Sequence, residues 1–200
     1  MRYIDMPPKR LYCQNCQETL ALPQNGTIKL YKELKCPLDN YELLLFSLGN
    51  VTGKQGTTYP LCPYCYNHPP SFTNDNGHVE QMPADMGCDA CAHPTCRHAM
   101  TKNMISDCPE TQECGGMLVL DVNSRPNWKL CCNNHSCNTL VKFHGDIHSI
   151  STLVGEPSCD TCMTRLLKFD IKTKDGRVEE RTGCIVCDDE LTGMTEMVKG

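Results

Sequence analysis

The sequence predicts a small, mainly β protein, built as a tandem array of zinc-ribbon-like β-hairpin modules held by four-cysteine zinc sites, with little helix. The 200 residues include 17 cysteines, most of them in Cys-x-x-Cys pairs or close clusters. Two pairs, Cys159/Cys162 and Cys184/Cys187, have 21 residues between them, which is ribbon spacing for one tetrahedral metal ion. Apolar residues come in short runs between turn signals, so bound metal must supply much of the stability.

The number of cysteines and the sequence at the start of the chain indicate the redox state of the cellular compartment. So many cysteines would also suit a secreted disulfide-bonded protein. However, Met1 is followed by Arg2-Tyr3-Ile4-Asp5 and two prolines, without the apolar core of a signal peptide, and no run approaches membrane-spanning length. We therefore expect a reducing compartment, metal-bound cysteines and no membrane partner.

The charge is acidic overall but unevenly distributed. The formal net charge is −5, and about four zinc ions on sixteen thiolates would add about −8. Residues 1–56 carry seven Lys/Arg against five Asp/Glu, whereas residues 57–100 carry one against four. Nucleic-acid binding would therefore need local patches, and the expected basic surface is Lys9, Arg10, Lys29, Lys32 and Lys35.

The first half of the chain contains two predicted modules. Residues 1–12 have the composition of an extended linker that enters the first knuckle, Cys13-Gln14-Asn15-Cys16. Asn25-Gly26 is a hairpin turn signal between two short strands. The sequence places zinc ribbon 1 at 13–58, with strands at 20–22, 27–31 and 41–46, and zinc ribbon 2 at 59–105, with a short helix at 97–105.

The second half repeats the pattern of knuckle, hairpin and knuckle. Gly115-Gly116 opens one hairpin, and Lys174-Asp175-Gly176 turns another. Zinc ribbon 3 is expected at 106–155 and zinc ribbon 4 at 156–200, with strands at 117–121, 128–132, 141–143, 147–150, 166–171 and 177–181.

Two ligand sets follow directly from spacing. The fourth ribbon uses Cys159, Cys162, Cys184 and Cys187, and the third uses Cys108, Cys114, Cys132 and Cys137. Cys131 competes with Cys132, because adjacent residues cannot easily bind the same tetrahedral ion.

The remaining eight cysteines fit two more zinc ions, but their partition stays open. One partition joins Cys62 and Cys65 with Cys91 and Cys96, and leaves Cys13, Cys16 and Cys36 with Cys88. The alternative joins Cys13 and Cys16 with Cys62 and Cys65, and forms a second cluster from Cys88, Cys91, Cys96 and His98.

We expect no active site in this chain. All-thiolate zinc sites are closed and electron-rich, so they do not readily generate a nucleophilic hydroxide. Cys131 near His135 is the one candidate for a free nucleophilic thiol, and no glycine loop of the phosphate-binding type is present.

Aromatic residues beside basic ones predict binding of single-stranded nucleic acid, since stacking of one base contributes about 1–3 kcal/mol whatever the sequence. The alternative is a zinc-stabilised protein-interaction module, which the acidic run Asp188-Asp189-Glu190 suits better. The predicted contacts are Tyr12 with Lys9 and Arg10, Tyr31 with Lys29 and Lys32, Trp128 with Arg125 and Lys129, and Phe143 with Lys142, with Lys35 beside them.

Several long motifs carry a family resemblance. They run from Pro7 to Cys13, Leu22 to Asp39, Tyr59 to Pro70, His93 to His98 and Leu118 to Asp121. These stretches closely resemble the C-terminal zinc-finger region of the eukaryotic topoisomerase III beta family of type IA topoisomerases, over nearly the whole chain. The wide spacings from Cys108 to Cys114 and from Cys132 to Cys137 depart from the family pattern.

The resemblance implies an isomerase that cuts one DNA or RNA strand through a tyrosine-phosphate bond, passes another strand and reseals the first. It places the nucleophilic tyrosine and the Mg-binding acidic domain in an N-terminal core that would precede Arg2. We therefore expect this chain to be non-catalytic and to hold single-stranded DNA or RNA for that core. The resemblance further implies the core and a Tudor-domain protein as partners, and the nucleus and cytoplasm as locations.

Overall fold

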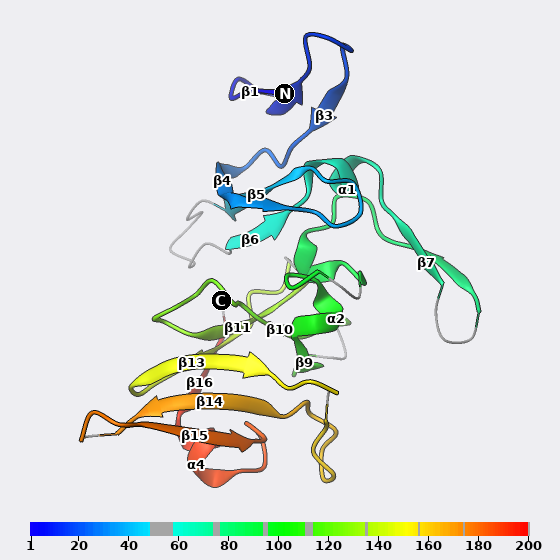
Figure 1. Cartoon of the computed structure of the whole chain (residues 1–200). Coiled ribbons are helices and arrows are strands. Elements are labelled where there is room, and N and C mark those ends of the chain that lie inside the picture. Colours follow the sequence, from blue (N-terminus) through cyan, green and yellow to red (C-terminus); the bar gives the residue numbers. More distant parts are fainter. Residues whose placement is uncertain are drawn as a thin grey trace. The chain divides into compact units, whose positions relative to one another are not determined.

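The computed structural model describes residues 1–48, 58–73, 77–93, 96–110, 114–134, 136–155, 157–173 and 175–199, apart from the side chains of Lys32 and Glu33. The chain divides into two compact units, Met1–Thr101 and Lys102–Gly200. Both are built from small antiparallel sheets with short helices (Figure 1), so the predicted mainly β fold is confirmed. The ribbon boundaries inside each unit stay predictions.

A three-stranded sheet opens the first unit, in the order β1-β2-β3. The segment 1–12, expected to be a linker, contains two of its strands. Tyr3 pairs with Leu11, and Leu11 pairs in turn with Leu20, which is fully buried. This pairing satisfies backbone groups that an extended linker would leave to water. The strands are β1 (Arg2–Ile4), β2 (Arg10–Tyr12) and β3 (Thr19–Ala21).

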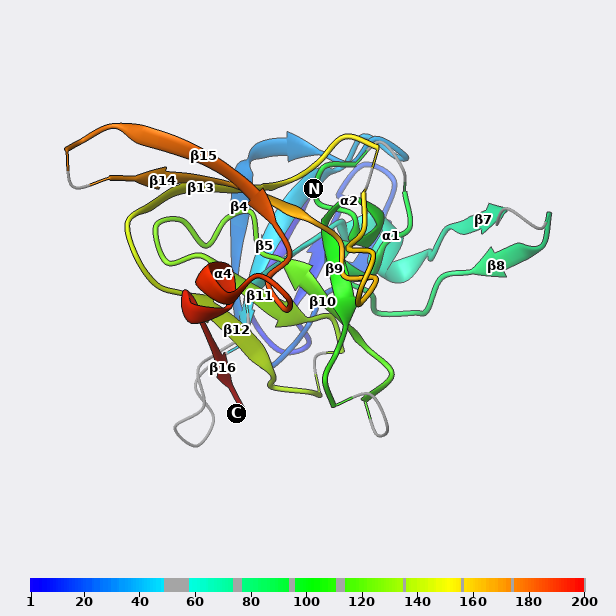
Figure 2. The same cartoon turned by 90° about the horizontal axis from the view of Figure 1, so that it is seen from below.

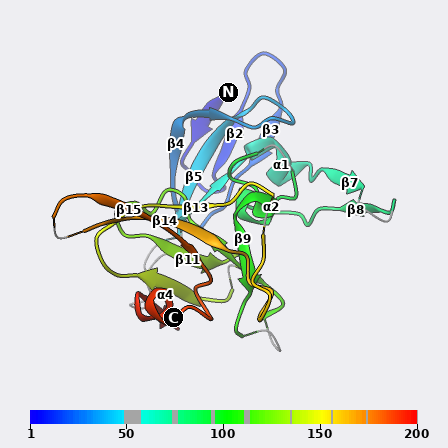
Figure 3. The ribbon, with the colours of Figure 1, turned by 60° about the horizontal axis from the view of Figure 1, so that its bottom comes forward.

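A second sheet of the same unit has the order β4-β5-β6, and β4 and β5 run side by side in Figure 3. Its core face buries Leu44, Phe46 and Leu61. Gly26 starts β4 because a Cβ there would lie 2.6 Å from the ring of Phe46. The strands are β4 (Gly26–Lys35), β5 (Glu42–Leu48) and β6 (Thr58–Leu61).

Short elements complete the first unit. The two-stranded hairpin of β7 (Ser71–Thr73) and β8 (Val79–Gln81) projects as an arm in Figure 2. The predicted helix at 97–105 is shorter in the structure, where α2 spans Met100–Asn103 and runs across the division between the two units in the sequence. The other helical elements here are α1 (Pro63–Asn67) and the 3-10 helix η1 (Cys88–Ala90).

The second unit contains two sheets around one core, which includes Ile105, Leu130, Phe169 and Leu191. One sheet has the order β16-β12-β11-β10-β9, and the other has the order β13-β14-β15, with its strands side by side in Figure 1. The elements are β9 (Met104–Asp107), β10 (Met117–Leu120), β11 (Lys129–Cys132), β12 (Leu140–Phe143), β13 (Ile147–Thr152), β14 (Leu167–Lys172), β15 (Val178–Gly183), α4 (Asp189–Gly193) and β16 (Thr195–Val198).

The two ribbons expected in this half are not independent of each other. Strand β16, from the segment expected as ribbon 4, pairs with β12, from the segment expected as ribbon 3. The backbone N–H of Arg165, also in expected ribbon 4, donates to the carbonyl of Ile105, the last residue expected in ribbon 2. None of the described helices reaches the length and apolar character needed to cross a lipid bilayer.

Candidate metal centres

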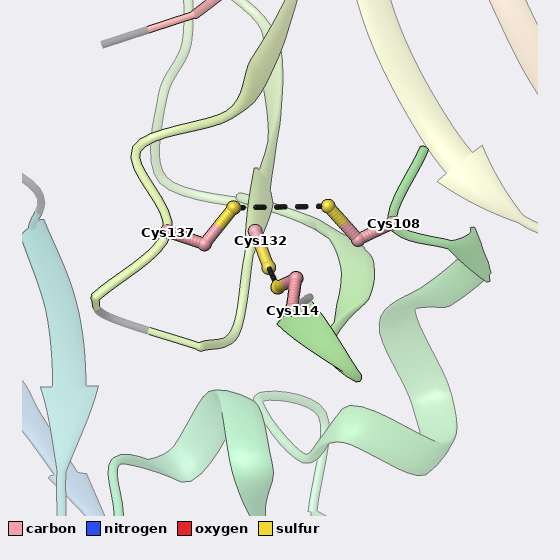
Figure 4. A group of neighbouring side chains, drawn as sticks. All are labelled: Cys108, Cys114, Cys132 and Cys137. Atoms are coloured by element: carbon pink, nitrogen blue, oxygen red, sulfur yellow. Dashed lines mark hydrogen bonds between the residues drawn. The ribbon is translucent and has the colours of Figure 1, made fainter. Parts of the chain in front are cut away.

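Four cysteines of the second unit point their sulfur atoms at one another (Figure 4). The Sγ atoms of Cys114 and Cys132 are 3.3 Å apart, and those of Cys108 and Cys137 are 3.8 Å apart. All four donor atoms lie within 4.8 Å of one another. The structure thus brings together the four residues expected for the third site, in an arrangement that suits tetrahedral zinc.

The backbone around these four cysteines holds their side chains close together. Gly116 follows Cys114 at a place where a Cβ would lie 2.6 Å from the Sγ of Cys132. The Asn134 side chain donates to the carbonyl of Cys114 at 2.9 Å, which ties the two knuckles together. Cys131 belongs to none of the described donor groups, because successive side chains of β11 point to opposite faces and Cys132 takes the face of the site.

The fourth expected site is also assembled, from Cys159, Cys162, Cys184 and Cys187, with all donor atoms within 4.8 Å. Hydrogen bonds from the side chain and backbone of Thr164 lower the pKa of Cys162 to about 6. The backbone N–H of Val186 donates to the Sγ of Cys184 at 3.4 Å. Such bonds favour the thiolate form, which is the form that binds metal.

The knuckle of Cys159 has a defined backbone geometry. The N–H of Cys159 donates to the carbonyl of Thr164 at 2.8 Å, and the N–H of Met163 donates back to the carbonyl of Cys159 at 2.9 Å. Met163 has a positive φ of 60°, which tightens the turn so that Cys159 and Cys162 face the same point.

The third donor group combines residues that neither expected partition joined. Cys36 follows β4, Cys62 and Cys65 flank the start of α1, and their donor atoms lie within 4.8 Å of one another and of a carboxylate oxygen of Asp39. Hydrogen bonds from Cys62 and then Cys65 lower the pKa of Cys36 to about 2. Their own pKa values are raised, since the bond with Cys36 keeps their protons in place. This corrects the grouping of Cys36 with Cys13 and Cys16.

Cys88, Cys91 and Cys96 are buried and line one cavity with Cys36, Cys62 and Cys65. Burial, followed by the neighbouring Cys96, Cys62 and Cys91, raises the pKa of the Cys88 thiol. The alternative cluster of these three with His98 is not among the described donor groups. His98 is buried, and its Nδ1 has no hydrogen-bond partner in the described part of the chain.

Cys13 and Cys16 lie in the turn between β2 and β3, where Cys16 is exposed. The described residues place no further metal-binding side chains beside them within the distance of a common site. Neither expected partner set for this pair is assembled.

The aromatic residues expected to stack on bases are placed differently. Tyr31 is 2% exposed, Trp128 6% and Phe143 8%. The ring of Phe143 packs edge to face against Phe169, 5.8 Å away, and Trp128 belongs to the same core. A sequence of alternating apolar and basic residues puts the apolar ring inside and the basic group outside, so these three rings cannot serve as stacking surfaces.

Several expected basic residues are held by nearby groups. Lys9 is half-buried beside Asp5, with 3.6 Å between Nζ and Oδ1, and Arg10 donates to the carbonyl of Pro8 at 2.8 Å. Lys129 lies 3.8 Å from Asp121. Three further residues were expected to contact nucleic acid. Tyr12 is half-buried, and Lys142 lies between Lys129 and Glu196 on the neighbouring strands of its sheet. Arg125 is exposed beside His148.

Among the members of the expected basic surface whose side chains are described, Lys29 and Lys35 are exposed, and both line an open cavity of about 640 Å³ in the first unit; the side chain of Lys32 lies outside the described residues. Tyr3 and Tyr41 line it too, and the ring of Tyr41 stacks on Tyr64 at 5.3 Å. Neither tyrosine was expected at a binding surface, since Tyr3 lay in the expected linker and Tyr41 in an expected buried strand.

A comparison with protein families matches residues 1–25 to the DNA topoisomerase 3-beta zinc ribbon domain. The matched residues comprise the sheet β1-β2-β3 and include the knuckle of Cys13 and Cys16.

Curated relatives match along the whole chain. DNA topoisomerase 3-beta-1 of Mus musculus is 44% identical over 201 residues, covering 98% of this chain and 21% of the relative. The Homo sapiens protein of the same name is 42% identical, and DNA topoisomerase 3-beta of Oryza sativa is 41% identical over 214 residues, with 23% of its length covered. The chain thus spans about a fifth of the relatives it matches. No solved structure matches significantly.

Proposed function

We propose that this chain is a zinc-stabilised, non-catalytic region of a type IA topoisomerase of the DNA topoisomerase 3-beta family, and that it binds single-stranded DNA or RNA; the relatives that match along its length support this. Strand cleavage and passage would be carried out by a separate catalytic core with its own Mg²⁺. The core and a Tudor-domain protein are the proposed protein partners, and the nucleus and cytoplasm are the proposed locations.

The three groups of metal-binding side chains are the observation that supports zinc binding. Two are made of four thiols each, and the third combines three thiols with a carboxylate. Thiolates are the ligands that structural zinc prefers, and closed sites of this kind stabilise the fold without offering an open coordination position for catalysis. Zinc would add to the stability that the apolar cores of the two units supply.

The cavity of the first unit is the proposed nucleic-acid contact. Lys29 and Lys35 line it and would offer cations to the phosphates, and Tyr3 and Tyr41, which line it too, would offer rings to the bases. A groove with cations along its rim and aromatic rings at its wall is the common arrangement for single strands without sequence preference. Asp39 and Glu42 also line the cavity and would favour contact with bases over phosphates at that end.

A salt titration with fluorescent single-stranded oligonucleotides tests the proposal. We expect binding that weakens steeply as salt rises, because each phosphate contact contributes about −0.7 to the slope of log K against log salt. Absence of binding at low salt to both DNA and RNA would refute it.

A protein-interaction module is the second candidate, favoured by one observation on the second unit. Exposed carboxylates lie on β15 and α4, at Glu179, Glu180, Asp189 and Glu190, of which Glu180 is paired with Lys168 and Glu190 with Arg181. This surface suits a basic protein better than a phosphate backbone. Binding of the isolated core to this chain, lost on substitution of these carboxylates by amides, would support it.

A further inference from the structure

Two knuckles of this chain share one backbone geometry. The N–H of Cys13 donates to the carbonyl of Glu18 and the N–H of Gln17 donates to the carbonyl of Cys13, both at 2.9 Å. Gln17 has a φ of 60°, the same value as Met163 in the knuckle of Cys159. In both knuckles the second cysteine stands three residues after the first, just before the residue with positive φ.

The segment that begins at Cys36 repeats this geometry. The N–H of Cys36 donates to the carbonyl of Tyr41 at 2.8 Å, and the N–H of Asn40 donates to the carbonyl of Cys36 at 2.9 Å. Asn40 has a φ of 61°. The residue three positions after Cys36 is Asp39, so a carboxylate occupies the place of the second cysteine.

The side chain of Asp39 points at the thiols. Its Oδ2 atom lies 3.1 Å from the Sγ of Cys62 and 3.1 Å from the Sγ of Cys65. Its Oδ1 atom accepts a hydrogen bond of 2.9 Å from the backbone N–H of Tyr41. The backbone therefore orients Oδ1, which also lies 3.3 Å from the Sγ of Cys62, while Oδ2 faces both thiols, as in metal sites where an outer hydrogen bond fixes a carboxylate ligand.

We propose that Asp39 is a zinc ligand and forms, with Cys36, Cys62 and Cys65, a ribbon site in which a carboxylate replaces one thiolate. This rests on the zinc-stabilised part of the proposed function. Between Asp39 and Cys62 lie 22 residues, close to the 21 between the pairs of the fourth site. Carboxylate oxygen binds zinc at about the same distance as imidazole nitrogen, so the tetrahedral geometry is retained.

The mixed site differs chemically from the four-thiolate sites. A carboxylate is a harder donor than a thiolate, so it holds zinc less tightly than a sulfur would in the same place. The site should therefore be the first to release zinc to a competing chelator. The assignment also leaves Cys91 and Cys96 outside this centre, in contrast to the partition that joined them with Cys62 and Cys65.

Metal binding by the full 200-residue chain and three variants tests the assignment. We expect Asp39→Ala to weaken one zinc site by more than about 100-fold in a chelator competition, because loss of even an outer-shell partner costs about 10- to 100-fold. Asp39→Cys should keep the metal count and slow the release of the most labile zinc. When Co²⁺ replaces zinc as the probe, Asp39→Cys should increase the sulfur-to-metal charge-transfer absorption by the amount that one additional thiolate ligand contributes.

Glu42→Gln is the matched control, since Glu42 is an exposed carboxylate that lines the same cavity as Asp39 and lies outside the donor group. It should leave both metal affinity and Co²⁺ absorption unchanged. Unchanged zinc affinity in Asp39→Ala, or unchanged Co²⁺ absorption in Asp39→Cys, would overturn the assignment even if the chain binds zinc. A wild-type chain that binds no zinc would instead refute the proposed function.

Discussion

The Sγ atom of Cys162 lies 3.5 Å from the Sγ atom of Cys184, although 21 residues separate them in the sequence. The hairpin of β14 and β15 makes this approach possible, since Leu167 pairs with Gly183 at its open end and so brings both knuckles to one point. Four thiols this close repel one another once ionised, and a bound dication removes that repulsion.

Replacing Cys184 by serine should therefore remove one zinc from the chain and destabilise the second unit. Elemental analysis together with thermal unfolding measures both effects. Cys131→Ser is the matched control, because Cys131 belongs to the same unit but to none of the described donor groups. Equal zinc content in the Cys184→Ser variant and the wild type would show that this group does not bind metal.

Gly116→Ala should weaken the third site. An alanine Cβ would lie 2.6 Å from the Sγ of Cys132 and 3.1 Å from the Sγ of Cys114, so the two thiols must move apart. We expect faster loss of one zinc to a chelator. Gly193→Ala, where a Cβ meets nothing within 4 Å, should leave release unchanged, and similar rates for both variants would contradict the geometry.

Trp128→Ala should act on stability rather than directly on nucleic-acid binding. The indole is buried in the core of the second unit, and truncation of a buried large aromatic costs about 3–5 kcal/mol. Chemical denaturation measures the loss. Trp128→Phe should fold and should bind single strands with wild-type affinity, whereas a binding defect in this folded variant would restore the stacking role expected from the sequence.

The double variant Lys29→Ala/Lys35→Ala should weaken binding of single-stranded oligonucleotides and lower the salt slope by about 1.4, the share of two phosphate contacts. Both lysines are exposed at the proposed cavity. Lys172→Ala, an exposed lysine of β14, is the control. If the control and the double variant lose affinity equally, the cavity is not the contact.

Tyr59 makes the stability of the first unit sensitive to alkali. Burial, followed by the nearby carboxylate of Asp89, raises the pKa of its hydroxyl above the usual 10. Below pH 10 both states keep the proton, and above it the unfolded chain loses its proton first, so the free energy of unfolding falls as pH rises. Tyr59→Phe should flatten this alkaline loss in denaturation curves above pH 10, and an unchanged slope would exclude the contribution.

The sequence predicted the fold class and the two donor groups of the second unit because spacing between cysteines reflects hairpin length directly. Strands such as β4, β5 and β14 overlap the expected ones, since turn signals and apolar runs are local properties. The pairing of β16 with β12 is not local, and neither strand carries a signal for the other.

In the first unit, the partition of cysteines failed because one donor of the group is not a cysteine. Asp39 stands in an ordinary Cys-x-x-Asp sequence, and only the backbone turn around Asn40 reveals its equivalence to a ligand. The prediction that Tyr31, Trp128 and Phe143 are exposed was wrong for a different reason. Trp128 and Phe143 each stand next to a lysine and are buried, as alternation of faces requires. Tyr31 and Lys29 are two residues apart, so alternation alone would place them on one face, yet Tyr31 is buried and Lys29 is exposed where the register of β4 becomes irregular after Leu30.

The zinc content of the chain, purified under reducing conditions without added metal, tests the three proposed metal centres together. The three donor groups predict at least three zinc ions per chain, and about four if Cys88, Cys91 and Cys96 take part in another site. Chelation should release them and unfold both units. Two or fewer zinc ions per chain, or a fold that survives their removal, would contradict the account.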